Sequence, residues 1–242
     1  MPKQVDYADR RHLIAEAVCR LADERGLEGV TLRDVAARAQ VSMGAVQRCF
    51  RTKEEMLAFT LGRVGDRIGE RIRARVAASP AQSAGTALGH AATEIALLRE
   101  EHRAEARVWL AFVAQAAVNE TLAATLKANY AALHEAFTHL VAEATESVDG
   151  LAPLDAPPDT PLASPLDASP DTPFASPLDA SHEARTLLAL TDGLTTHVLI
   201  GHLTPHAARD VLHAHLANLW ARTVRTARPT TGPAVRSDQP DR

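Results

Sequence analysis

Apolar residues recur at three- and four-residue steps along most of the chain, which is the spacing of one face of an α-helix. The first stripe, from about Tyr7 to Arg25, is formed by Ile14, Val18, Leu21 and Ala22. Gly26 follows it, as expected of a residue that takes the left-handed conformation after a helix. The pattern predicts an all-α fold.

Two short helices with a tight turn between them are predicted next, from about Thr31 to Ala39 and from Ser42 to Phe50. Thr31 is suited to cap the first helix, with Asp34 three residues on, and Ser42 to cap the second. One apolar seam is formed by Val35, Ala36, Ala39, Val41, Val46 and Phe50. The residues predicted to point outward are Arg33, Ser42, Met43, Ala45, Gln47 and Arg48. This is a helix-turn-helix with a polar outer face suited to a major groove.

A long helix is predicted from the Thr52 cap to Ala77, before Pro80. Its length is roughly 37 Å at 1.5 Å per residue, so one rod would be shared by two domains. Its apolar stripe is formed by Met56, Leu57, Phe59, Leu61, Val64, Ile68, Ile72 and Val76. Its solvent side is predicted to carry Arg67, Arg71, Arg73 and Arg75. Glu55 completes a capping box, and Lys53 lies in the first turn.

Helical spacing continues in three segments, about 83–100, 103–117 and 120–146. Four of the few aromatic residues fall here among small residues, a composition that can leave a ligand cavity between helices. Ordinary core packing is the alternative. The aromatic candidates for a ligand site are Trp109, Phe112, Tyr130 and Phe137. The polar candidates are His90, Gln115, Asn119 and His134.

Residues 148–181 contain copies of a 12-residue unit, PLDAPPDTPLAS, PLDASPDTPFAS and a partial PLDAS, with eight of the 14 prolines. Proline at this density suits neither helix nor strand, so a mobile linker is predicted. A proline-rich docking segment is the alternative. The PxxP-like pieces lack the flanking arginine or lysine that SH3 ligands often use.

Deleting residues 154–178 should leave the oligomeric state, the melting temperature and the affinity for DNA nearly unchanged, because a segment without a buried face contributes little to folding. Thermal unfolding and duplex binding of the deletion variant check this. A large loss of stability would mean that the segment is a packed element.

Two further helices are predicted, at 182–200 and after the Thr204 cap, with Pro205 at the first helical position where proline is favoured. Both are apolar enough to require burial. The apolar residues of the pair are Leu187, Leu188, Leu194, Val198, Val211, Leu212, Leu216, Leu219 and Trp220. The tail from residue 229 has the composition of a disordered segment. The predicted domains are therefore 1–55 and 56–228, followed by a tail at 229–242.

Composition and charge narrow the functional classes. The chain has 242 residues and a net charge of −4. Residues 1–75 contain 15 Lys and Arg against 11 Asp and Glu, whereas the remainder contains 11 against 19. A basic helix-turn-helix part is expected of a nucleic-acid contact, although an ordinary solvated surface can carry the same balance. No run approaches the roughly 20 apolar residues of a membrane span, and no signal peptide is evident, so a cytoplasmic location is expected.

No catalytic or metal motif stands out. Five histidines, His197, His202, His206, His213 and His215, do not share one helical face, so no metal site is predicted. Neither a nucleophile elbow nor a phosphate or dinucleotide loop occurs. No cofactor is therefore expected. The two cysteines, Cys19 and Cys49, are interpreted as inert thiols, with a redox switch as the alternative.

Residues from about Arg11 to Leu61 resemble the DNA-binding domain of TetR-family regulators, through the helix ending in Gly26, then VTLRDVAARAQVSMGAV, then FRTKEEML. LLALTDGLTTHVLIG resembles the penultimate helix of one subgroup. Gln47 and Cys49 depart from the family, which usually has an aromatic residue, most often tyrosine, at the first position and frequently an aromatic or histidine at the second. The resemblance implies that Lys53 contacts a phosphate and that the last two helices pack against their twin in a homodimer.

The resemblance implies a homodimeric transcriptional regulator, in this family most often a repressor, that binds a palindromic double-stranded DNA operator and is released by a small-molecule effector. The expected DNA-binding residues are Thr31, Arg33, Ser42, Met43, Gly44, Ala45, Gln47, Arg48, Thr52 and Lys53. Two alternatives remain, a DNA-binding dimer without an inducer and an all-helical enzyme. The helix-turn-helix signature without a catalytic constellation disfavours the enzyme.

Overall fold

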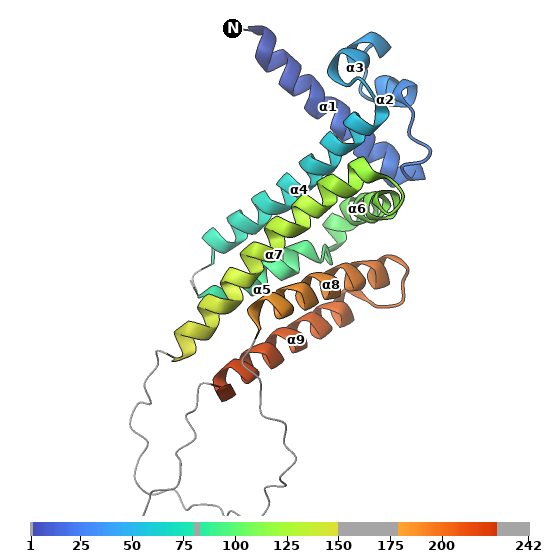
Figure 1. Cartoon of the computed structure of the whole chain (residues 1–242). Coiled ribbons are helices and arrows are strands. Elements are labelled where there is room, and N and C mark those ends of the chain that lie inside the picture. The colour runs from blue at the N-terminus through green and yellow to red at the C-terminus, as the bar shows by residue number, and fades with distance from the viewer. Residues whose placement is uncertain (1, 80–82, 150–178, 227–242) are drawn as a thin grey trace, which may run out of the picture.

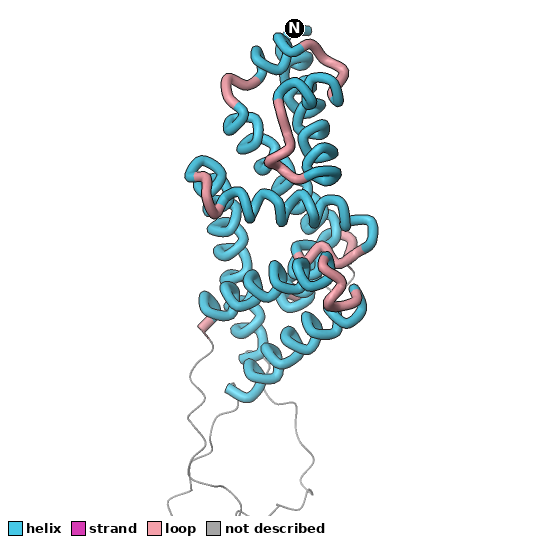
Figure 2. The backbone as a smooth tube through the Cα atoms, turned by 90° about the vertical axis from the view of Figure 1, so that its right-hand side faces the viewer, coloured by secondary structure: helices cyan, strands magenta, loops and turns pink. Residues whose placement is uncertain are grey.

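The computed structural model describes residues 2–79, 83–149 and 179–226, and all regular structure in these ranges is helical (Figures 1 and 2). The all-α prediction is therefore confirmed. The helices are α1 (Pro2–Arg25), α2 (Leu32–Arg38), α3 (Met43–Cys49), α4 (Lys53–Ala77), α5 (Ala84–Ile95), α6 (Arg103–Ala116), α7 (Glu120–Asp149), α8 (Ala180–Leu199) and α9 (Pro205–Thr226), with a 3-10 turn at Glu100–His102.

Local capping sets most helix starts where the sequence places them. The side chains of Thr31, Ser42 and Thr52 accept backbone N–H groups three residues on, at 3.2, 3.1 and 3.0 Å. The Thr204 hydroxyl caps α9 in the same way, at 3.1 Å from the N–H of Ala207. Gly26 has φ 74°, as predicted for the residue that ends α1.

The prediction of one helix over 83–100 was wrong, because α5 ends at Ile95. Leu97 has φ 47°, a left-handed conformation that a helix cannot include. Leu97 and Leu98 are both buried, so the chain turns out of the helix and places two leucines in the core. The strain at Leu97 is offset by their burial, a tertiary effect that the helical spacing did not indicate.

The long helix α4 runs from the end formed by α1, α2 and α3 to the middle of the molecule (Figure 1). It packs against α1 beside the small helices α2 and α3, and further along it packs against α5, α6 and α7. Its buried residues are Met56, Leu57, Thr60, Leu61, Val64 and Ile68. The last helices α8 and α9 pack on α5 and α7 at the opposite end from α3. The predicted long helix is therefore continuous, and it contacts helices that precede it and helices that follow it in the chain.

The proline-rich repeat up to residue 178 and the tail from residue 229 lie outside the described residues. Within the described ranges, the structure contains no helix with the length and apolarity needed to cross a membrane.

Candidate DNA-binding face and regulatory interior

The recognition helix α3 presents a mixed polar face to solvent. Ser42, Met43, Gln47 and Arg48 are exposed, and Met43 keeps 38% of its surface accessible. Gly44 is half-buried beneath Arg48, so that a Cβ on Gly44 would lie 3.5 Å from a guanidinium nitrogen of Arg48. This face carries a hydrogen-bonding amide and a guanidinium on adjacent positions, which is the chemistry that reads base edges and phosphates.

The prediction that Ala45 points outward was wrong, because Ala45 is only 6% exposed. Ala45, Val46 and Cys49 fall on the inner side of α3, where the small Ala45 side chain packs into the domain. A helix of seven residues has room for only one narrow outer face, and Ser42, Met43, Gln47 and Arg48 occupy it.

The turn between α2 and α3 holds the two helices at a defined angle. Gln40 has φ 55°, and the N–H of Val41 donates to the carbonyl of Ala36 at 3.0 Å. Thr31 also donates its hydroxyl to the Asp34 carboxylate at 2.7 Å, and this hydrogen bond lowers the pKa of Asp34. The Asp34 carboxylate that accepts from the Thr31 cap is therefore ionised at neutral pH.

Residues suited to phosphate contact border α3 on both sides. Thr31, Arg33 and Thr52 are exposed. Lys53 is half-buried, and its ammonium lies 3.5 Å from the carbonyl of Leu27. The capping box of α4 differs slightly from the predicted one, because Glu55 accepts the N–H of Arg51 at 2.8 Å.

An arginine-aromatic stack fastens α1 to the end of α3. The Arg11 guanidinium lies 4.5 Å from the Phe50 ring centroid and 4.3 Å from that of Phe59, with the Glu55 carboxylate at 3.7 Å. Tyr7 donates its hydroxyl to the carbonyl of Cys49 at 3.3 Å. Sequence reasoning missed this cluster, because three separate segments, α1, the end of α3 and α4, contribute to it.

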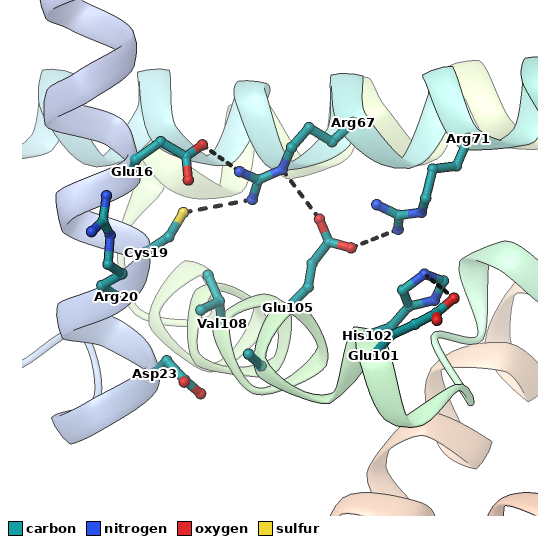
Figure 3. Close-up of a pocket in the computed structure, with 11 residues that line it drawn as sticks. Glu16, Cys19, Arg20, Asp23, Arg67, Arg71, Glu101, His102, Glu105 and Val108 are labelled. Atoms are coloured by element: carbon teal, nitrogen blue, oxygen red, sulfur yellow. Dashed lines mark hydrogen bonds and ion pairs between the residues drawn. The ribbon is translucent and has the colours of Figure 1, made fainter.

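A charged junction joins α1, α4 and α6 (Figure 3). Arg67 on α4 donates to Glu16 of α1 at 2.5 Å and to Glu105 of α6 at 3.3 Å. Arg71 donates to the other oxygen of Glu105 at 2.5 Å. The prediction that these two arginines lie on the solvent side of α4 was wrong. Both are half-buried, because helices α1 and α6 bring carboxylates to them.

Cys19 lies in the same junction, 3.8 Å from a guanidinium nitrogen of Arg67. Burial raises the pKa of the Cys19 thiol, and Arg67 only partly opposes this effect. A raised pKa disfavours the reactive thiolate. Both cysteines are free thiols, Cys19 half-buried and Cys49 buried, an arrangement that supports the inert interpretation over a redox switch.

A half-buried carboxylate, Asp192 on α8, lies among the helices of the regulatory part. Asp192 accepts a hydrogen bond from the Trp109 indole at 3.4 Å and another, short one from the Tyr130 hydroxyl. The Trp109 and Tyr130 rings meet edge to face, with centroids 6.1 Å apart. Burial raises the pKa of Asp192, and the same carboxylate and burial raise the pKa of Tyr130. Within the described part of the chain, no lysine or arginine pairs with Asp192.

A small cavity of about 180 Å³ lies against Trp109, between α4, α5, α6 and α7. Its other lining residues are Gly65, Asp66, Ile68, Gly69, Ile95, Asn129, Ala132 and Leu133. The side-chain nitrogen of Asn129 is buried without a hydrogen-bond partner in the structure. Its amide is a polar group available to orient a small molecule, and its position was not among those predicted.

The predicted ligand residues do not gather at one place. Phe112 and Phe137 are fully buried core. Gln115 is half-buried, and Asn119 caps α7 by accepting the N–H of Leu122 at 3.0 Å. His134 bonds the Ser181 carbonyl at 3.1 Å, and His90 lines a different cleft, against α9. Trp109 and Tyr130 alone among the eight meet at Asp192.

The residues predicted for a dimer interface are mostly core of a single chain. Exposure is 7% or less for Leu187, Leu188, Leu194, Val198, Leu212, Leu216 and Leu219. Val211 is 43% exposed and Trp220 is half-buried, so these two keep accessible surface. The apolar residues chosen from the sequence pack on α5, α6 and α7 because those helices cover the inner faces of α8 and α9.

The C-terminal histidines remain apart from one another, except for His197 and His202, whose rings are 4.9 Å apart. In the described ranges, no group of three or more histidine, cysteine or acidic side chains is arranged to hold a metal ion.

Comparison with known proteins identifies the family to which this fold and this candidate site are similar. Residues 14–58 match the family model for bacterial regulatory proteins of the tetR family. Residues 84–161 and 162–221 match the model for the C-terminal part of BetI-type transcriptional repressors. The HTH-type transcriptional regulator PksA of Bacillus subtilis is 30% identical over 200 residues, which cover 83% of both chains. The regulator BetI of Burkholderia thailandensis is 41% identical over 64 residues, which cover 26% of this chain and 33% of BetI.

Solved structures share the architecture. A transcriptional regulator from Rhodococcus sp. Rha1 superposes with a TM-score of 0.67 at 26% identity, over 87% of this chain and 96% of that one. A transcriptional regulator from Saccharomonospora viridis, solved in complex with choline, has a TM-score of 0.67 at 21% identity, over 87% of this chain and 96% of that one.

Proposed function

Because the chain belongs to the TetR family of bacterial transcriptional regulators, which are not enzymes, we propose that it is a cytoplasmic repressor. It binds a palindromic operator as a homodimer. It leaves the operator when a small cation enters the regulatory part. The observation that carries the proposal is the face of α3, where Met43, Gln47 and Arg48 are exposed together. A two-fold dimer places two such helices in successive major grooves, so the operator is an inverted repeat with half-sites about one helical turn apart. Selection of bound sequences from a random duplex pool tests this.

The dimer that we propose uses the outer faces of α8 and α9. The buried leucines hold these helices in each protomer, and the accessible residues Ile200 and Val211 supply apolar surface around exposed small residues such as Ala214. Trp220 instead lies against α5, where a Cβ on Gly85 would be 3.4 Å from its ring. Small residues allow two helix pairs to approach closely, in keeping with the family's four-helix interface.

Replacing Lys53 with alanine is expected to weaken binding to every duplex sequence and to reduce the slope of log affinity against log salt by about one unit, because one phosphate contact is lost. In the free protein Lys53 reaches only a carbonyl at 3.5 Å, which leaves its charge available. Duplex binding between low and moderate salt measures the slope. Lys127→Ala, at an exposed position on α7, is the matched control. An unchanged slope would contradict the role of Lys53.

The effector proposed is a small organic cation. Asp192 is a half-buried carboxylate with two aromatic donors and no partner cation in the described residues, and aromatic faces beside a carboxylate attract quaternary ammonium groups. The related structure from Saccharomonospora viridis holds choline, which supports a ligand of this kind. The cavity of about 180 Å³ shares Trp109 with this cluster, while Asp192 and Tyr130 are not among its lining residues.

Replacing Asp192 with asparagine should abolish release of the operator by choline and should not lower the melting temperature at pH 7.5. Asparagine can accept from Trp109 and donate to the Tyr130 oxygen, and it removes a buried charge. Because burial raises the folded pKa of Asp192 above its unfolded value, the stability it contributes is present at low pH and is lost as pH rises through the folded pKa. The variant's advantage should therefore appear at neutral pH and disappear in acid.

The measurements are thermal unfolding across pH and operator binding with choline as the probe. Asp210→Asn is the control, since Asp210 is exposed and pairs with His206 at 2.8 Å. A variant that choline still releases would place the effector elsewhere. Failure of choline and other small ammonium compounds to release the parent protein would favour a dimer without a cationic inducer.

A further inference from the structure

A second cleft, of about 440 Å³, lies between the end of α4, one side of α5 and the start of α9. Its lining residues are Arg75, Thr86, Gly89, His90, Thr93, Leu98, Arg99, Arg209 and His213. Three guanidiniums, two imidazoles and two hydroxyls therefore face one space. The described residues that line it include no carboxylate, although the chain as a whole carries a net charge of −4.

The positions follow from helix geometry. Thr86, Gly89, His90 and Thr93 lie at three- and four-residue steps and form one stripe along α5. Arg209 and His213 are four residues apart and form the facing edge of α9. Gly89 faces Leu216 of α9, and a Cβ on Gly89 would lie 3.9 Å from a methyl carbon of Leu216, which is an ordinary van der Waals distance. The left-handed turn at Leu97 then brings Arg99 back to the end of the cleft.

The positive charge of the cleft is only partly compensated. Glu94 is 3% exposed behind the cleft and is shared by Arg71, Arg75 and Arg99, at 3.6, 3.9 and 3.4 Å. Arg99 also pairs with the exposed Glu101 at 3.3 Å. Arg209 makes no ion pair within the described part of the chain, since its neighbour Asp210 pairs with His206. The Arg209 guanidinium, and part of the charge of Arg75, are therefore available to bind a ligand.

We propose that this cleft binds a small polyanion through phosphate or carboxylate groups, at a site separate from Asp192. Guanidinium groups bind both kinds of oxyanion through paired N–H donors, and the cleft has the size of a small-molecule site. The Thr93 hydroxyl already donates to the carbonyl of Gly89 at 2.7 Å, and the Thr86 hydroxyl lies 2.9 Å from that of Ser83. The imidazole N–H groups of His90 and His213 therefore supply the further donors. A ligand held by Arg75, Arg99 and Arg209 would connect α4, the turn after α5 and α9.

The test is calorimetric titration of the full-length protein, without DNA, with inorganic pyrophosphate and separately with citrate. Saturable binding of at least one of them, at one site per chain, is expected, and the two probes distinguish phosphate from carboxylate ligands. Arg209→Gln and Arg75→Gln should each weaken binding at least tenfold. Arg185→Gln, an exposed position on α8 outside the cleft, should change it less than twofold.

Thermal unfolding and operator binding of each variant separate this result from the repressor proposal. Arg209 is exposed, so Arg209→Gln is expected to keep the parent's melting temperature and operator affinity. Absence of saturable binding by either anion, or an equal loss in Arg185→Gln, would overturn the polyanion site and leave the DNA-binding role untouched.

Discussion

Replacing Gln47 with alanine is expected to remove preference for one base pair in each half-site while leaving affinity for unrelated duplex DNA almost unchanged. Glutamine can pair with the N6 and N7 edge of adenine, and such a bidentate contact contributes about 1 to 3 kcal/mol of discrimination. Two half-sites double the effect on a full operator. Gln47 is exposed on α3, so its removal costs the fold little.

The experiment measures binding of the parent protein and Gln47→Ala to operators that carry each of the four base pairs at every half-site position. In the variant, the four base pairs should be bound with nearly equal affinity at one position of each half-site, and the preferences at all other positions should be unchanged. Arg33→Ala provides the contrast, since loss of a phosphate contact should weaken all duplexes alike. A uniform loss from Gln47→Ala, with the base ranking intact, would mean that Gln47 touches only the backbone.

Replacing Glu105 with glutamine should lower stability by about 2 kcal/mol, or about 4 to 8 °C in melting temperature for a chain of this size. The Glu105 carboxylate is 13% exposed and holds both Arg67 and Arg71. Its neutralisation leaves two half-buried guanidiniums short of a partner. This expected loss is smaller than the roughly 3 to 5 kcal/mol of fully buried pairs, because both arginines reach solvent.

The matched control is Glu100→Gln, since Glu100 is 77% exposed and pairs with Arg103 at 3.1 Å. Its melting temperature should change by less than about 1 °C, as usual for surface ion pairs. Operator binding of Glu105→Gln, measured below its melting transition, reports whether the junction also sets the DNA-bound arrangement. Equal melting temperatures for the two variants would contradict a structural role for the junction.

Features encoded within a few residues were predictable. The caps at Thr31, Ser42, Thr52 and Thr204 and the left-handed Gly26 depend on neighbouring residues alone, and the structure has each of them. The helix-turn-helix is also encoded by residues close together in the chain. For this reason most of the residues exposed on its outer face could be predicted from the sequence. Ala45 was misplaced because a seven-residue helix carries too few residues to define a stripe.

Features that depend on distant segments were not predictable. Asp192 stands in an apolar helical stripe, and only the fold brings Trp109 and Tyr130 to it from 83 and 62 residues away. Arg67 has the spacing of a solvent-facing residue until α1 and α6 supply carboxylates. The leucines of α8 and α9 were apolar enough for an interface between chains, but the same apolarity serves the interior of one chain.

Because α4 is one continuous helix, a rotation about the Arg67 junction would displace its two ends by unequal distances. Arg67 binds the helix to α1 and α6, and Lys53 lies 14 residues away, about 21 Å at 1.5 Å per residue. A tilt of about 5° around that point would move the end beside α3 by about 2 Å. A base contact tolerates much less displacement than that. If the proposed effector tilts α4 around Arg67, a few degrees would be enough to release the operator without unfolding or a large rearrangement.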